Sequence, residues 1–177
     1  MKKSLHILIG AVILAFTFNA CGGAGQQVKT ETAKETKTEE KQVQVKADAG
    51  GDIAVNAIND QVGGFYITGF RGGSSKIDRN KDLEYMKKIV KLVKPIIDKV
   101  PDGYVMEITG HCADYESAAE QKRVSEERAK TIYNELKKAG ASAKKMTYRG
   151  AGTDEPLKGV DGKDPRQRRV SFKAIKQ

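Results

Sequence analysis

The stretch that decides the fold is residues 104–140, YVMEITGHCADYESAAEQKRVSEERAKTIYNELKKAG. Its first part, Tyr104–Thr109, is a short run rich in aromatic and β-branched residues that follows a Pro-Asp-Gly turn, which predicts a strand. From about Ser117 to Lys138, apolar residues recur every three or four positions, which predicts a helix with one buried face. Gly140 is the residue type that commonly ends such a helix.

The segment before this stretch repeats the pattern of a strand followed by a helix. Phe65–Phe70 alternates and predicts a first strand, which ends in the glycine-rich loop 71–75. Asp78 or Asn80 is expected to cap a helix that runs to about residue 97. Pro95 is expected to kink or shorten this helix.

The segment after it contains two further apolar runs, Lys145–Tyr148 and Arg168–Ile175, which predict the last two strands. Arg168 and Arg169 would alternate on the final strand, one toward the sheet and one toward solvent. The element order is then β-α-β-α-β-β. The predicted fold class is an α/β sandwich, with the helices packed on one face of a mixed sheet.

The 177 residues carry a net charge of +9 that is unevenly distributed. Residues 22–50 contain five Lys and five acidic residues, whereas residues 51–177 contain 25 Lys and Arg against 18 Asp and Glu. The positive excess therefore belongs to the part of the chain that is expected to fold. Such a field favours an anionic partner: a nucleic acid, a membrane surface or a cell-wall polymer.

The N-terminus has the features of an export signal. Lys2 and Lys3 precede an apolar run of about a dozen residues, which is short against the ~20 residues that a spanning helix needs. Cys21 follows a small residue and precedes glycines, as in the lipobox of bacterial lipoproteins. We expect a signal peptide over residues 1–20 and a lipid on Cys21, whose acyl chains would hold the protein on a bilayer. Export also excludes nucleic acid as a partner.

Residues 21–52 are expected to form the lipidated N-terminus and a disordered tether. They are rich in Gln, Lys, Glu and Thr and contain few large apolar residues, so they cannot bury a core. A globular pattern begins at about residue 53 and continues to residue 177. The sequence thus predicts one folded domain, 53–177, at the end of a spacer.

Four motifs in the folded part resemble, in order and spacing, those of the OmpA-like peptidoglycan-binding domain. They are Ile108–His111, Gln121–Ala129, Gly150–Pro156 and Gln167–Val170. The lipid, spacer and domain layout is similar to that of the peptidoglycan-associated lipoproteins. The resemblance implies the α/β sandwich described above and a site for the diamino acid of the peptidoglycan stem peptide.

The resemblance also implies which residues would hold that ligand. Arg128 would bind its carboxylate, since a guanidinium fork binds carboxylates in a bidentate manner. The acid that the family has two residues after the histidine is replaced here by Ala113, and the next residue, Asp114, is expected to bind the ammonium. Gln121 lies two helical turns before Arg128 on the same face and would support the loop.

The sequence does not favour an enzyme. His111 has no second His or Cys at metal-ligand spacing, so no metal site is expected, and no cofactor motif is present. Cys112 has no base beside it other than its chain neighbour His111, whose side chain points the other way on an extended backbone. We therefore expect neither catalytic residues nor a cofactor.

Two functions fit these features. The first is an outer-membrane lipoprotein that anchors the membrane to peptidoglycan, with its domain in the periplasm. The second is an OmpA-like lipoprotein that has lost wall binding and acts as an adhesin or assembly partner, exposed at the cell surface. The displaced acid Asp114 favours the second, and other envelope proteins are further candidate partners.

Overall fold

The computed structural model describes residues 50–115 and 117–177. These residues belong to one compact unit, Glu39–Gln177. The expected signal peptide, Cys21 and most of the expected tether lie outside the described residues. No helix within the described ranges has both the length and the apolar character that a membrane span requires.

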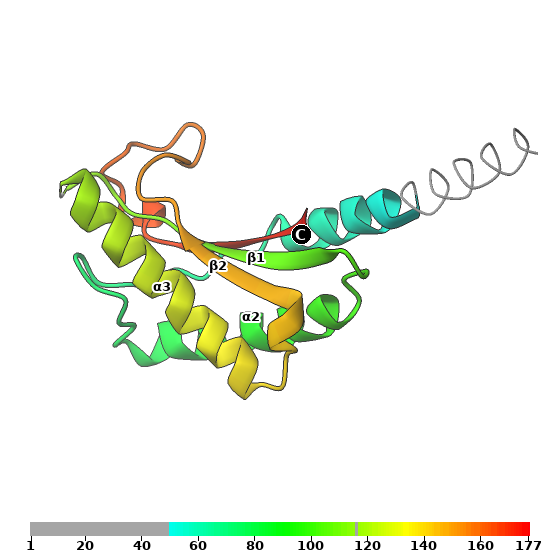
Figure 1. The fold of residues 1–177 in the computed structure, drawn as a ribbon. Helices are drawn as coiled ribbons and strands as arrows, with labels where there is room; N and C mark the ends of the chain where they lie inside the picture. The colour runs from blue at the N-terminus through cyan, green and yellow to red at the C-terminus, as the bar shows by residue number, and fades with distance from the viewer. Residues whose placement is uncertain (1–49, 116) are drawn as a thin grey trace, which may run out of the picture. The chain divides into compact units, whose positions relative to one another are not determined.

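Three helices and three strands make up the described part of the chain (Figure 1). The described part of the chain starts within a helix, which ends at residue 62. It is followed by α2 (Asn80–Asp98) and α3 (Ala118–Lys138). Two short 3-10 helices precede the second and third strands: η1 (Ala143–Lys145) and η2 (Pro165–Gln167).

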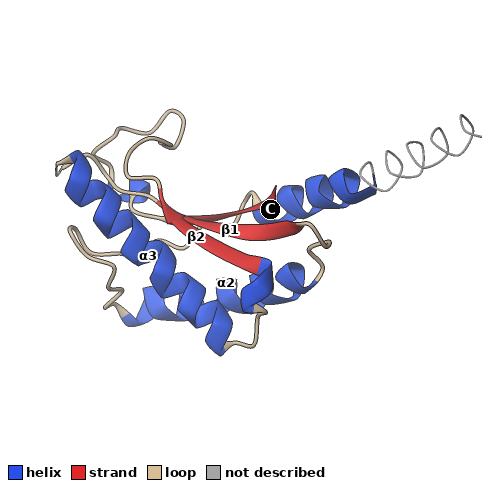
Figure 2. Cartoon of the chain, viewed as in Figure 1, coloured by secondary structure: helices blue, strands red, loops and turns tan. Residues whose placement is uncertain are grey.

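The sheet has the order β2-β1-β3 and is mixed, as expected. The central strand β1 (Tyr104–Gly110) pairs in parallel with β2 (Met146–Gly150), and antiparallel with β3 (Val170–Lys176). Side chains alternate across the sheet, so Met106 and Ile108 face the core while Glu107 and Thr109 face the other side. Helices α2 and α3 cover the core face (Figure 2).

The expected first strand, Phe65–Phe70, does not form as a strand. Only Ile67 pairs with the sheet, through two hydrogen bonds to Val170 on the outer edge of β3. Further along that edge, the side-chain amide of Asn59 accepts from the backbone N–H of Ala174 and donates to its carbonyl. The first helix thus occupies part of the edge along which a fourth strand would have run.

Three other expected boundaries differ in detail. Arg79, and not Asp78 or Asn80, is the N-cap of α2, and it makes no side-chain cap. The helix continues for three residues past Pro95, although Pro95 has no N–H to donate to the carbonyl four residues earlier. Arg168 and Arg169 precede β3 instead of lying in it.

Two glycines allow α3 to approach the sheet closely. Gly110 on β1 and Gly150 on β2 are register partners, and both face Ser125 of α3. A Cβ on Gly110 would lie 1.8 Å from the backbone oxygen of Ser125, and one on Gly150 would lie 2.4 Å from its hydroxyl. The hydroxyl of Ser125 in turn accepts from the backbone N–H of Gly152. These contacts fix the N-terminal half of α3 against the ends of two strands.

Candidate functional site

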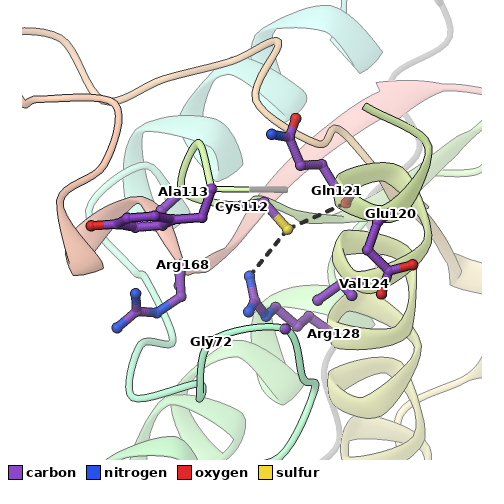
Figure 3. A pocket seen from close by; sticks show the side chains of 10 residues that line it. Gly72, Cys112, Ala113, Glu120, Gln121, Val124, Arg128 and Arg168 are labelled. Atoms are coloured by element: carbon purple, nitrogen blue, oxygen red, sulfur yellow. Dashed lines mark hydrogen bonds between the residues drawn. The ribbon is translucent and has the colours of Figure 1, made fainter. Parts of the chain in front are cut away.

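A cavity of about 300 Å³ opens beside the N-terminal half of α3 (Figure 3). We call it the arginine cavity, and it is lined by Gly72, Gly73, Cys112, Ala113, Tyr115, Glu120, Gln121, Val124, Arg128 and Arg168. Three chain segments meet here: the glycine-rich loop after Phe70, the loop after β1, and the segment before β3. Residues of two of the four sequence motifs, Gln121–Ala129 and Gln167–Val170, line this cavity.

Arg128 lies at the inner end of this cavity and is 1% exposed. It donates to three backbone carbonyls at 2.8–2.9 Å, those of Arg71, Ser74 and His111, and to the Cys112 sulfur at 3.3 Å. Four of its five N–H groups are thus engaged. Arg128 ties the glycine-rich loop to the loop after β1, so it holds the cavity in shape.

The guanidinium of Arg128 has no carboxylate partner among the described residues. Burial lowers its pKa from the ordinary value, and the neighbouring charge of Arg168 lowers it further. The face of Phe70 lies 5.5 Å from the guanidinium carbon and offers a cation–π contact. A buried cation without an acid favours an anionic ligand.

Arg168 is the more available of the two cations. Its Nε donates to the Phe70 carbonyl at 3.2 Å, and its terminal N–H groups have no partner among the described residues. The side chain is half-buried and extends along the wall of the cavity opposite α3 (Figure 3). The sequence placed Arg168 on a strand, and the adjacent arginines gave no signal as to which of them would face a ligand.

Asp114 does not line the arginine cavity. Its carboxylate accepts from the Gln121 amide at 3.0 Å, and its backbone N–H donates to the Gly162 carbonyl. The expected pair of Asp114 and Arg128 therefore does not meet around this cavity. The only lining residue that carries a carboxylate, within residues 50–115 and 117–177, is Glu120, which the sequence did not single out.

Gln121 joins two loops at the rim. Besides its bond to Asp114, it accepts from the Thr153 hydroxyl at 3.1 Å through its side chain, and from the Cys112 thiol through its carbonyl at 3.2 Å. Burial raises the pKa of the Cys112 thiol, although Arg128 acts in the opposite direction. The thiol is therefore protonated at neutral pH and can donate this bond. Gln121 thus links the loop after β1 to the loop after β2 through these hydrogen bonds.

A second cavity, of about 310 Å³, lies on the sheet face away from α2 and α3. This open-face cavity contains Arg149, which forms ion pairs with Glu107 at 2.8 Å and Glu155 at 2.6 Å. Arg169 is 5% exposed there and donates to the Glu155 carbonyl at 2.7 Å, with the Tyr66 ring 5.8 Å away. Unlike those of the arginine cavity, most of its charges are paired within the protein.

His111 connects the two cavities. Its imidazole faces the open-face cavity and bonds to the Ser171 hydroxyl at 2.8 Å, while its carbonyl accepts from Arg128. Burial, with the charges of Arg169 and Arg149, lowers the pKa of His111 to about 3, so the ring is neutral at physiological pH. Within the described residues no group of three or more His, Cys, Asp or Glu side chains could hold a metal ion.

Sequence and fold comparisons agree with this architecture. Residues 69–169, more than half of the chain, match the OmpA family. The fold is thus an α/β domain, and its candidate site is a cationic cavity between three loops. The chain belongs to the OmpA family. No curated protein matches the sequence at a significant level.

Two solved structures share the fold at low sequence identity, and a third aligns less well. The OmpA-like domain of FopA1 from Francisella tularensis aligns with a TM-score of 0.50 and 20% identity, over 62% of this chain and 70% of that one. The C-terminal domain of MotB from Helicobacter pylori aligns with a TM-score of 0.51 and 16% identity, over 64% and 85%. The peptidoglycan-associated lipoprotein of Burkholderia pseudomallei gives a TM-score of 0.49 and 14% identity, over 62% and 89%.

Proposed function

We propose that this protein binds peptidoglycan non-covalently through the arginine cavity and so anchors an outer membrane to the cell wall. The observation that carries the proposal is the presence of two neighbouring guanidiniums, Arg128 and Arg168, without a carboxylate partner among the described residues. Membership of the OmpA family supports the same ligand class. The ligand is the free end of the stem-peptide diamino acid, and neither an enzyme activity nor a cofactor is involved.

The two arginines have different tasks in this proposal. Arg168 supplies the free pair of N–H groups that a carboxylate binds in a bidentate manner. Arg128 adds its remaining N–H and its charge, while its other bonds hold the two loops. Gln121 and Asp114 form the support beneath the rim, with Asp114 acting through the Gln121 amide.

Anchoring is the second half of the proposal. Cys21 carries the lipid, and the residues up to the first described helix act as the spacer between bilayer and wall. Changing Cys21 to Ser should release the protein from the membrane fraction, and unchanged partitioning would contradict lipidation. The domain then lies in the periplasm, with the wall and other envelope proteins as its partners.

Purified sacculi test wall binding directly. The full chain carrying Cys21→Ser should co-sediment with sacculi, and Arg168→Ala should weaken binding about tenfold or more, because it removes charged hydrogen bonds. The matched control is Arg166→Ala, since Arg166 is exposed, pairs with Asp164 and does not line the cavity. Equal retention of all three proteins would remove the arginine cavity from wall binding.

A specific observation favours the alternative function. Ala113 lies in the wall of the cavity where the family resemblance predicts an acid, and Asp114 points elsewhere. If the chain does not bind sacculi at all, the surface adhesin or assembly partner becomes the better account. Protease accessibility of the domain on intact cells distinguishes the two locations.

A further inference from the structure

A groove of about 560 Å³ lies between α2 and α3, away from the arginine cavity. We call it the helix groove, and it is lined by residues of α2 and of the C-terminal end of α3: Glu84, Met86, Lys87, Lys88, Val90, Lys91, Glu135, Lys138 and Ala139. None of these residues lines the arginine cavity, which opens beside the N-terminal half of α3. A partner bound in the helix groove would therefore leave the proposed wall site open.

The floor of the helix groove is apolar. Met86 and Val90 are 6% and 7% exposed, and both belong to the hydrophobic core. Ala139, at the end of α3, adds a small side chain to the wall. Methionine adapts its shape to irregular apolar partners. The floor can thus receive apolar side chains that project inward past the rim.

The rim of the helix groove is basic. Four of the lining residues are Lys and two are Glu. Lys138 pairs with Glu135, whereas Lys87, Lys88 and Lys91 are exposed and form no ion pair with any described residue. The rim therefore presents unpaired positive charge, which favours an acidic partner.

Three other occupants fit this combination of floor and rim less well. A second copy of the chain, docked groove to groove, would place the same lysines opposite one another. Residues 22–50 contain five Lys and five acidic residues, so this segment has no net charge to complement the rim. The flat surface of an anionic membrane would contact the lysines but leave the floor unfilled, because Met86 and Val90 are recessed.

We propose that the helix groove binds an acidic amphipathic helix of another protein. Such a helix presents apolar side chains at spacings of three and four residues, which is how helices dock into hydrophobic grooves. The apolar side chains would contact Met86, Val90 and Ala139, and carboxylates on the flanks would pair with the lysines. This role goes beyond wall binding and uses the other end of α3, so one domain can hold the wall and a partner at the same time.

Fluorescence anisotropy with three labelled peptides tests the proposal on the full chain carrying Cys21→Ser. Each peptide has ~18 residues, which is long enough to form a helix. The acidic peptide carries Leu at positions i, i+4 and i+7 of one face and Glu on both flanks. The neutral peptide has Gln in place of Glu, and the scrambled peptide keeps the acidic composition but disperses the Leu residues.

The acidic peptide should bind most tightly. The neutral peptide should bind about fivefold less tightly, since it lacks the exposed ion pairs to the rim. The scrambled peptide should also bind less tightly, because its Leu residues cannot reach the floor together. Higher salt should weaken binding of the acidic peptide and leave that of the neutral peptide unchanged.

Two variants of the chain locate the binding surface. The double variant Lys87→Gln with Lys91→Gln should lose about fivefold for the acidic peptide and nothing for the neutral one. Ala139→Trp fills the groove from an exposed position and should weaken both peptides. The matched control is Lys81→Gln with Lys99→Gln, which removes two exposed lysines at the ends of α2 that do not line the groove. All of these proteins should unfold at the same temperature and bind sacculi as the parent does.

Equal affinity of the parent for the acidic and neutral peptides would overturn the proposal, as would equal affinity of the Lys87/Lys91 double variant and its control for the acidic peptide. Co-sedimentation with phosphatidylglycerol vesicles in the absence of peptide binding would assign the lysines to a membrane and overturn it as well. A dimer of the parent that Ala139→Trp abolishes would assign the groove to a second copy. Sacculus binding is measured separately, so each of these failures leaves the proposed function intact.

Discussion

Arg128 and Arg169 are buried to a similar degree on opposite faces of the sheet, and neither has a carboxylate partner among the described residues. Their surroundings differ. Arg128 lies beside a second, largely free cation, Arg168, at a cavity with one acid on its rim. Arg169 lies beside Arg149, which is already paired with Glu107 and Glu155. A buried arginine alone does not indicate a ligand site; the unpaired charges around it do.

The largest expected effect is on stability, because these two arginines differ in the hydrogen bonds that they donate within the protein. Arg128→Met keeps the apolar stem but leaves three carbonyls without a donor, which should lower the free energy of unfolding by roughly 3–5 kcal/mol. Arg169→Met leaves fewer acceptors unpaired and should lower it by about 1–3 kcal/mol. Urea unfolding of both variants provides the measurement. A greater loss for Arg169→Met would reverse the comparison.

Binding to sacculi provides a second comparison of Arg128 and Arg169. Arg169→Met, measured well below its unfolding temperature, should bind as the parent does, because the open-face cavity takes no part in wall binding. Weakened binding in this variant, with the fold intact, would show that the two cavities are not independent.

A smaller effect is expected where α3 meets the strands. Gly110→Ala would push a methyl group into the Ser125 carbonyl, so we expect a loss of about 3 kcal/mol in the free energy of unfolding. Gly64→Ala is the control, since a methyl group added there would meet no atom within 4 Å and the backbone at this residue is unstrained. A Gly110→Ala variant as stable as the control would mean that α3 is less firmly packed than the contacts indicate.

The change in stability at acidic pH tests the surroundings of His111, whose ring faces the open-face cavity. His111 has a pKa of about 3 in the folded chain and about 6.5 when unfolded, so the unfolded state binds more protons between these values. The contribution of the neutral His111 ring to the free energy of unfolding is complete above pH 6.5 and is lost as the pH falls toward 3. Between pH 7.5 and 5 the free energy of unfolding should drop by about 2 kcal/mol. His111→Gln should abolish most of this drop; a drop of the same size would assign it to other groups.

The sequence correctly predicted two of the helices, because the spacing of apolar residues along the chain determines them. Periodicity located α2 and α3, and the spacing of the motifs brought Gln121 and Arg128 to one cavity. The strand expected at Phe65–Phe70 failed because pairing at an edge depends on tertiary neighbours, and here the Asn59 side chain and Ile67 form hydrogen bonds to that edge of β3. Alternation along a single run of residues contains no information about such a neighbour.

The composition of the site was harder to predict than its location. A shift of one residue in a loop changes the direction of a side chain, so Asp114 points to Gln121 and not into the cavity. Glu120 and Arg168 reach the cavity because of where α3 and the segment before β3 lie in three dimensions. Other charged residues lie within three positions of each, such as Arg123 near Glu120 and Arg169 beside Arg168, and no pattern distinguishes them before the fold is known.

Protection of Cys112 tests most directly whether the wall binds in the arginine cavity. In the full chain with Cys21→Ser, Cys112 is the sole thiol, and it lines this cavity. Its raised pKa predicts slow modification by methyl methanethiosulfonate at pH 8, and saturating stem-peptide fragment should slow the reaction at least severalfold further. An unchanged rate with sacculi still bound would show that peptidoglycan is held elsewhere on the molecule.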